Sequence, residues 1–205
     1  MSDLLGQMFG GRGGRGRGGV DPRRGTDLEA SLDISFLDAV NGTTTSLRLS
    51  TEGESNSREV NVRIPAGVDN GQRIRIKGRG EPGRNGSPAG DLLLTCNVGS
   101  HHLFGREGKN LTVQLPITFT EAALGANIEV PTLDGSTVTL RLKAGTQAGS
   151  RHRVKGKGIN ANGESGDLIV SVDVVVPKDL TDKQKKLLQQ LDEISEDSPR
   201  SRMFS

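Results

Sequence analysis

Aromatic residues are scarce in this sequence of 205 residues, which has no Trp, no Tyr and only five Phe. Aromatic rings are the platforms on which proteins stack nucleic-acid bases and sugars, so few such platforms can form here. Cysteine occurs once, as Cys96, which excludes an intramolecular disulfide and a zinc site built from several cysteines. A single cysteine fits a reducing compartment, and we expect a cytoplasmic protein.

Long apolar runs are also missing. No run approaches the ~18 residues that a membrane helix needs, so we expect no membrane segment. Residues 1–6 have neither the basic n-region nor the apolar h-region of a secretory signal, so we expect no such signal. The net charge is only +2, which does not favour strong attraction of the whole chain to nucleic acid. The common nucleophile, zinc-protease and phosphate-loop motifs do not occur, and three poorly spaced His do not suggest a metal site. We therefore expect no enzyme, no metal and no cofactor.

The first segment, residues 1–24, is dominated by glycine interleaved with Arg12, Arg15 and Arg17. Glycine at this density would lose more backbone entropy on folding than its few apolar residues could offset, which predicts a flexible linker. Two roles stay open for it, a soluble tether or an RNA-binding Arg/Gly segment.

Apolar and polar residues alternate with period 2 from Asp27 onwards, which is typical of half-buried strands. Gly, Asn, Asp and Pro separate the runs and mark turns. Short strands at this spacing predict a mostly β fold of sandwich or barrel type. The runs are 28–36, 47–49, 60–64, 74–76, 92–98, 111–119, 138–142 and 168–176.

An internal repeat organises these strands. The segment VRIPAGVDNGQRIRIKGRG at 62–80 recurs as LRLKAGTQAGSRHRVKGKG at 140–158, 78 positions later throughout. Upstream, ISFLDAVNG at 34–42 matches ITFTEAALG at 117–125, 83 positions later. We therefore predict two tandem copies of one β unit. The two offsets differ by about five residues, which we place as an insertion within 50–57 of the first copy.

Each copy has one short helical signal, and in the second copy we expect Thr120 to cap a turn that stops at Gly125. Turns that need a positive φ are expected at Gly67, Gly71, Gly78 and Gly80.

Basic residues alternate with isoleucine or glycine in the first repeated segment, so they should face solvent. They are Arg73, Arg75, Lys77 and Arg79. Such a row fits either a nucleic-acid groove or an ordinary solvated face, and the nearly balanced charge of the chain favours the solvated face.

A helix is predicted after Pro177, with Thr181 as its N-cap and Ile194 near its end. Its apolar stripe consists of Leu187, Leu188, Leu191 and Ile194. The stripe needs an apolar partner, either the second β unit or a second copy of the chain. The tail from Ser195 onwards is expected to be loose.

The duplicated signature IPAGVxxGQRIRxKGxG, followed by PAGDL at 88–92, resembles the C-terminal region of DnaJ-type J-domain co-chaperones. The same resemblance extends to HLFGR at 102–106, EAALG at 121–125, VPTL at 130–133 and PKDLT at 177–181. Residues 2–10 look like the end of the Gly/Phe-rich linker of that family, so the resemblance covers essentially the whole chain.

Two features of the family are missing from this sequence. No His-Pro-Asp tripeptide occurs, so we expect no J domain and no stimulation of ATP hydrolysis by a DnaK-type chaperone. The cysteine-rich zinc module of type I members, which would sit near 50–57, is absent as well. The parent is either of the zinc-free type or a type I protein without its module. The zinc-free type includes a curved-DNA-binding J protein, which keeps nucleic-acid binding as the alternative function.

The resemblance implies a co-chaperone fragment that binds exposed hydrophobic segments of unfolded polypeptides and prevents aggregation. In the full-length protein it would deliver these clients to a DnaK-type chaperone. The implied architecture is two β-sandwich-like units, at 25–106 and 107–177, followed by a dimerisation helix and tail at 178–205. The implied client-binding residues are Leu28, Leu47, Leu49, Val60 and Phe104, and the implied homodimer contacts are Leu187, Leu188, Leu191 and Ile194. If the client-binding residues were fully buried, a scaffold dimer without a client site would remain.

Overall fold

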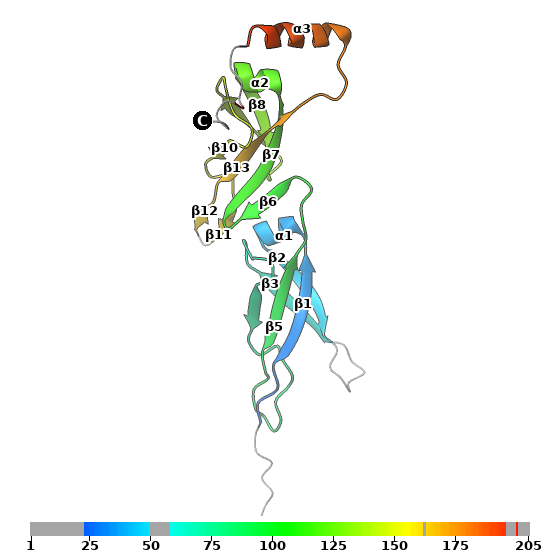
Figure 1. The fold of residues 1–205 in the computed structure, drawn as a ribbon. Coiled ribbons are helices and arrows are strands. Elements are labelled where there is room, and N and C mark those ends of the chain that lie inside the picture. Colours follow the sequence, from blue (N-terminus) through cyan, green and yellow to red (C-terminus); the bar gives the residue numbers. More distant parts are fainter. Residues whose placement is uncertain (1–22, 50–57, 162, 196–199, 201–205) are drawn as a thin grey trace, which may run out of the picture. The chain divides into compact units, whose positions relative to one another are not determined.

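The computed structural model of the chain describes residues 23–49, 58–161, 163–195 and 200. Within them the chain folds into two compact units that divide between Ser100 and His101, and each is described by itself (Figure 1). The Arg/Gly segment, the insertion expected within 50–57 and most of the C-terminal tail lie outside the described residues.

The first unit contains two small sheets that face each other across a core. Its elements are β1 (Leu28–Ile34), α1 (Phe36–Asn41), β2 (Thr43–Leu49), β3 (Arg58–Ile64), β4 (Arg73–Ile76) and β5 (Leu92–Val98). One sheet has the order β1-β5-β4, with β1 parallel and β4 antiparallel to β5, and the other is the antiparallel pair β2-β3. Alternate side chains of β3 and β5 fill the core, and Val60, Val62 and Leu94 are at most 1% exposed.

The second unit repeats this plan and adds strands to it. Its elements are β6 (Phe104–Glu107), β7 (Asn110–Thr118), α2 (Phe119–Leu124), β8 (Ala126–Pro131), β9 (Thr137–Leu142), β10 (Arg151–Val154), β11 (Asn160–Ala161), β12 (Glu164–Ser165) and β13 (Leu168–Val175). The main sheet has the order β10-β13-β7-β6, in which β13 is parallel to β7. The pairs β8-β9 and β11-β12 are antiparallel. Helix α3 (Asp182–Glu193) follows β13.

The predicted duplication is confirmed strand by strand. The parallel pair β1-β5 corresponds to β7-β13, the pair β2-β3 to β8-β9, and β4 to β10. The chain is therefore mostly β, built of two similar sandwich-like units with short helices, as the repeat indicated, and a C-terminal helix follows them.

The two short helices occupy the same place in each unit. Ser35 caps α1 and Thr118 caps α2, each accepting a hydrogen bond from the backbone N–H three residues on. The expected cap at Thr120 was wrong by two residues, because Thr118 already offers its hydroxyl to the N–H of Glu121 at 3.2 Å. Both helices stop at a glycine with positive φ, 76° at Gly42 and 81° at Gly125.

The expectation of turn glycines is correct at three positions and wrong at the fourth. Gly67, Gly71 and Gly78 have φ between 67° and 78°. Gly80 does not have a positive φ, and a Cβ on it would lie 2.6 Å from the carbonyl oxygen of Thr26. Glycine is therefore required at this position by close backbone approach, which turn chemistry does not reveal.

Helix α3 begins and ends where the sequence predicted. Thr181 forms a capping box with Gln184, whose side chain accepts a hydrogen bond from the Thr181 N–H at 2.8 Å. Ile194 is the C-cap.

Candidate functional site

The residues expected to bind clients fall on different parts of the fold. Leu28 lies on β1 and Leu47 and Leu49 lie on β2, and all three side chains are half-buried. Val60 lies on β3 opposite Leu47 and is 1% exposed, so its side chain belongs to the core against which Leu47 packs.

Two further half-buried apolar residues, Ala30 and Leu32, were not among the expected client-binding residues. Ala30 and Leu32 alternate with Leu28 along β1, and both pack against the core cluster that also supports Leu47 and Leu49. The period-2 pattern of β1 contained the signal, because residues i, i+2 and i+4 share a face of a strand. We call Leu28, Ala30, Leu32, Leu47 and Leu49 the apolar strip.

Phe104 lies in the second unit, on β6, where it is opposite Val113 of β7 and 6% exposed. Residues up to 106 were expected in the first unit, whereas β6 pairs with β7 and belongs to the second. A strand of four residues without strict alternation gave no signal of this pairing.

Strand β1 lies at one end of its sheet, and β5 is its only hydrogen-bonded neighbour within the described residues. The N–H of Leu28 donates to the carbonyl of Asp91 at 2.8 Å, and the N–H of Gly99 donates to the carbonyl of Ile34 at 3.0 Å. Backbone groups alternate in direction along a parallel strand, so those of Glu29, Ser31 and Asp33 point away from β5. The apolar strip therefore lies beside an open strand edge.

The corresponding positions of the second unit are buried. They lie 83 residues after the members of the apolar strip and are 7% exposed or less: Leu111, Val113, Leu115, Val130 and Thr132. Strand β6 pairs with β7 along the edge that β1 leaves open in the first unit. An open apolar strip is thus a property of the first unit.

A buried carboxylate anchors the first unit. The side chain of Asp91, 6% exposed, accepts hydrogen bonds from the N–H of Gly78 at 2.7 Å and from Nε of Arg75 at 2.7 Å, and it pairs with Arg24 at 3.0 Å. These donors, the backbone N–H of Gly78 first, lower the pKa of Asp91 from its ordinary 3.8 to about 2. The carboxylate is held ionised and bonded, which fits structural support better than proton transfer.

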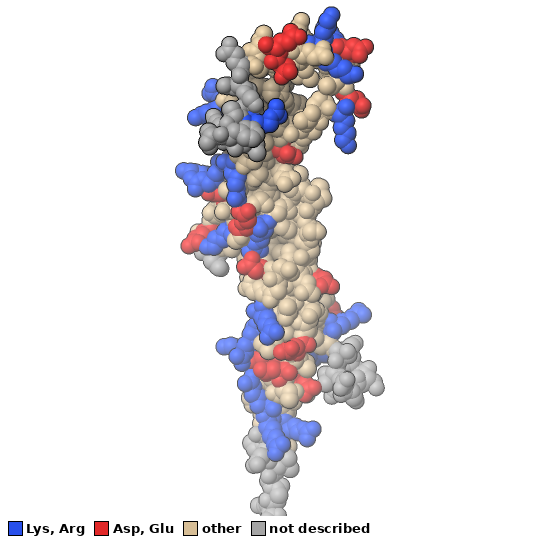
Figure 2. All heavy atoms as spheres, viewed as in Figure 1, with Lys and Arg blue, Asp and Glu red and all other residues tan. Residues whose placement is uncertain are grey.

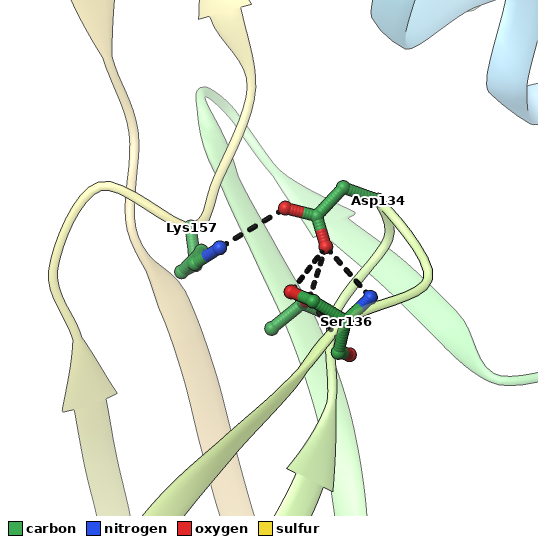
Figure 3. A network of polar contacts seen from close by, with 4 residues as sticks. Asp134, Ser136 and Lys157 are labelled. Carbon is green, nitrogen blue, oxygen red and sulfur yellow. Dashed lines mark hydrogen bonds and ion pairs between the residues drawn. The ribbon is translucent and has the colours of Figure 1, made fainter.

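A network of polar contacts lies at the turn between β8 and β9 (Figure 3). The carboxylate of Asp134 accepts hydrogen bonds from the hydroxyls of Ser136 at 2.6 Å and Thr132 at 2.5 Å, and Lys157 pairs with it at 3.0 Å. The two hydroxyls and the backbone N–H of Ser136 hold the pKa of Asp134 far below its usual range, with Lys157 contributing less. The network fastens a turn to the loop after β10.

The described part of the chain holds no group of three or more His, Cys, Asp or Glu side chains placed to bind a metal ion. Cys96 is fully buried in the first unit, and burial raises the pKa of its thiol. None of the described helices has the length and apolar character that crossing a membrane requires.

Helix α3 presents its apolar stripe to solvent. Leu187, Leu188, Leu191 and Ile194 are between 42% and 77% exposed, and α3 has no buried residue. Contiguous exposed apolar side chains of this kind mark interaction surfaces.

The duplicated β unit, with a half-buried apolar strip in one copy and an exposed helix after the other, defines a class of tandem β-sandwich proteins. A family described as DnaJ C terminal domain matches residues 28–177. The chain therefore belongs to the DnaJ C-terminal domain family.

Curated relatives of the chain are named as DnaJ chaperones. The chain is 38% identical over 250 residues to "Chaperone protein DnaJ 1" of Streptomyces coelicolor, an alignment that covers 90% of this chain and 63% of the relative. It is 35% identical over 267 residues to "Chaperone protein DnaJ" of an Exiguobacterium species, covering 97% and 72%. A shorter alignment with the protein of that name from Exiguobacterium sibiricum reaches 48% over 143 residues, covering 69% and 39%.

This chain spans 63% of the length of the Streptomyces coelicolor relative. The alignments of 250 and 267 positions are longer than the 205 residues of the chain, so both relatives contain residues that have no counterpart here.

Proposed function

We propose that the first unit binds extended apolar segments of unfolded polypeptides and that the chain acts as the holding part of a co-chaperone, without catalysis. In a longer protein it would deliver these clients to a DnaK-type chaperone. The observation that supports this proposal is the half-buried apolar strip beside the open edge of β1.

Two physical contributions favour such binding. An unfolded client exposes apolar side chains, and their transfer onto the strip removes apolar surface from water. The client backbone can hydrogen-bond to the groups of Glu29, Ser31 and Asp33 that face away from β5, which gives affinity with little demand on sequence.

We propose further that α3 joins two copies of the chain through its exposed stripe. Two strips in one dimer would raise the apparent affinity for a long client without any new contact, provided that both can be engaged together. Leu191→Asp places a charge in the stripe and should weaken the dimer, and light scattering of wild type and variant at matched concentrations measures this. An unchanged dimer would remove α3 from the interface.

The alternative function is nucleic-acid binding through the basic strand residues. Arg73, Arg75, Lys77 and Arg79 are all exposed, as a solvated row requires. Arg75 is paired with Asp91 at 2.5 Å, and Figure 2 shows Lys and Arg interleaved with Asp and Glu over the surface of this unit. The acidic side chains therefore offset part of the basic charge on the face in view.

The deciding experiment measures binding of the chain to a fluorescent, permanently unfolded polypeptide at low and high salt. Wild type is compared with the double variant Leu47→Ser, Leu49→Ser, which makes the strip polar at half-buried positions. Leu124→Ser is the matched control, because Leu124 is 80% exposed in the second unit and lies outside the strip.

We expect binding that survives high salt, a clear loss in the double variant and no change in Leu124→Ser. Equal affinity of wild type and double variant, with unchanged circular dichroism, would place the site elsewhere. Binding that disappears at high salt would favour the nucleic-acid alternative, because release of counterions makes such binding steeply salt-dependent.

A further inference from the structure

Strand β6 occupies the edge of β7 in the second unit, while the equivalent edge of β1 is open in the first. The pairing is antiparallel, with Phe104 opposite Val113, Gly105 opposite Thr112 and Arg106 opposite Leu111. The second unit therefore contains, within its own chain, an extended segment bound beside the counterpart of the apolar strip.

The two edges have the same backbone geometry. Leu111 donates its N–H to the carbonyl of Asp167 at 3.0 Å, as Leu28 donates to Asp91 at 2.8 Å. The outward-facing position that follows is Thr112 in the second unit and Glu29 in the first, 83 residues apart. A segment on β1 can thus adopt the register that β6 adopts on β7.

We infer that β6 is an internal counterpart of the client strand, so that its pairing with β7 indicates the direction and register of a client on β1. This inference rests on the proposed function. The client runs antiparallel to β1 and places an apolar residue opposite Ala30, as β6 places Phe104 opposite Val113. That residue shares a face with the apolar strip, because residues directly opposite in a sheet lie on the same side.

The next client residue lies opposite Glu29, on the other side of the sheet. In the second unit this place belongs to Gly105, where a Cβ would come within 2.5 Å of the Thr112 hydroxyl. The first unit has the flexible, exposed side chain of Glu29 there, which forms no ion pair with any described residue. Glu29 lies opposite Leu93 of β5, and Leu93 lies opposite Arg75 of β4. The side chain of Arg75 is bound to Asp91.

Opposite charges across a strand pair are favourable and like charges are unfavourable. The preferred client is therefore an extended segment in which the residue after the apolar anchor is Lys or Arg and not Asp or Glu. The expected preference is about two- to fivefold in affinity, the usual size of a cross-strand pair.

The test uses fluorescein-labelled peptides with the sequence of residues 101–108, HHLFGREG, and the full chain. Three peptides are compared by fluorescence anisotropy: the native sequence and its Gly105→Lys and Gly105→Glu versions. A fourth peptide, Phe104→Ser, removes the apolar anchor. The protein variants are Glu29→Lys and, as a matched charge control on β3, Glu59→Lys, which is also exposed.

We expect wild type to bind the Lys peptide about two- to fivefold more tightly than the Glu peptide. Glu29→Lys should reverse this order, whereas Glu59→Lys should keep it. The Phe104→Ser peptide should lose binding. All peptides should also lose binding to the Leu47→Ser, Leu49→Ser protein. Because that protein keeps β6 and β7 unchanged, this loss distinguishes peptides bound on β1 from peptides that displace β6.

Failure of the β6 peptides to bind, while the unfolded polypeptide still binds, would overturn this inference and leave the proposed function intact. An order of affinities that Glu29→Lys does not reverse would overturn the register. If neither the peptides nor the unfolded polypeptide binds, the proposed function fails as well.

Discussion

The two β units share a backbone plan but differ at one edge. In both, the carboxylate of a Gly-Asp step accepts a hydrogen bond from the N–H of a loop glycine: Asp91 from Gly78 at 2.7 Å and Asp167 from Gly156 at 2.8 Å. In the second unit β6 covers the edge that the first unit leaves open. The duplication has kept the bonds that hold the loops and has changed the edge that is available to a partner.

The polar anchors of the two units also differ in strength. Asp91 is bonded by Arg75 at 2.5 Å and by Arg24, whereas Arg153 lies 3.5 Å from Asp167, which is more exposed. The second unit instead uses the network around Asp134, which ties its β8-β9 turn to Lys157. The two similar units thus hold their loops and turns in place with different side chains.

The largest effect is expected from truncating equivalent core leucines, one in each unit. Leu92 on β5 and Leu168 on β13 are both fully buried. Leu92→Ala and Leu168→Ala should each lower the unfolding free energy of their own unit by about 2–5 kcal/mol, from lost transfer energy and the cavity that remains. Denaturant unfolding followed by hydrogen exchange would measure the loss and locate it. Loss of protection in both units from either variant would mean that they unfold as one.

A smaller difference is expected between Asp91→Asn and Asp167→Asn. The pKa of Asp91 is lowered on folding to about 2, so its contribution to stability is complete above its unfolded pKa of 3.8 and is lost as the pH falls to about 2. The stability difference between wild type and Asp91→Asn should be constant near neutral pH and shrink below about pH 4. Asp167→Asn should cost less, because its ionic partner is more distant. Equal losses at neutral pH, measured by urea unfolding, would contradict this asymmetry.

The smallest effect is expected at the helix caps. Ser35→Ala and Thr118→Ala should each cost about 0.5–2 kcal/mol. Thr118 should cost more, because Glu121 completes a capping box with it, accepting from its N–H at 2.8 Å, and no such box is formed at Ser35. Thermal unfolding of both variants tests the order. Glu121→Gln is the control, because Gln can also complete the box.

Most of the fold could be read from the sequence because the strands are amphipathic. The strand expected at 92–98 is β5 without change, and α3 begins after the predicted cap Thr181. The short strand β6 could not be recognised, because its identity as a strand comes from pairing with β7. The same holds for the close approach at Gly80, which involves Thr26, far away in the sequence.

The candidate site was predicted only in part. Leu28, Leu47 and Leu49 do lie on the partly open surface, and their contact with clients stays a prediction. Ala30 and Leu32 were overlooked although they share the period of Leu28. Val60 alternates in the same way as Leu47, and periodicity alone does not tell a half-buried face from a fully buried one.

By itself, the sequence determined the two copies, the alternation that makes each strand amphipathic, and the start of the last helix. These are local properties, encoded by spacing and by capping residues. The tertiary structure alone decided that β1 lies parallel to β5, that Val60 is covered while Leu47 is half-open, and that β6 closes the second unit. Those outcomes depend on which distant segments remove apolar surface and backbone groups from water together, and a pattern along the chain does not contain that information.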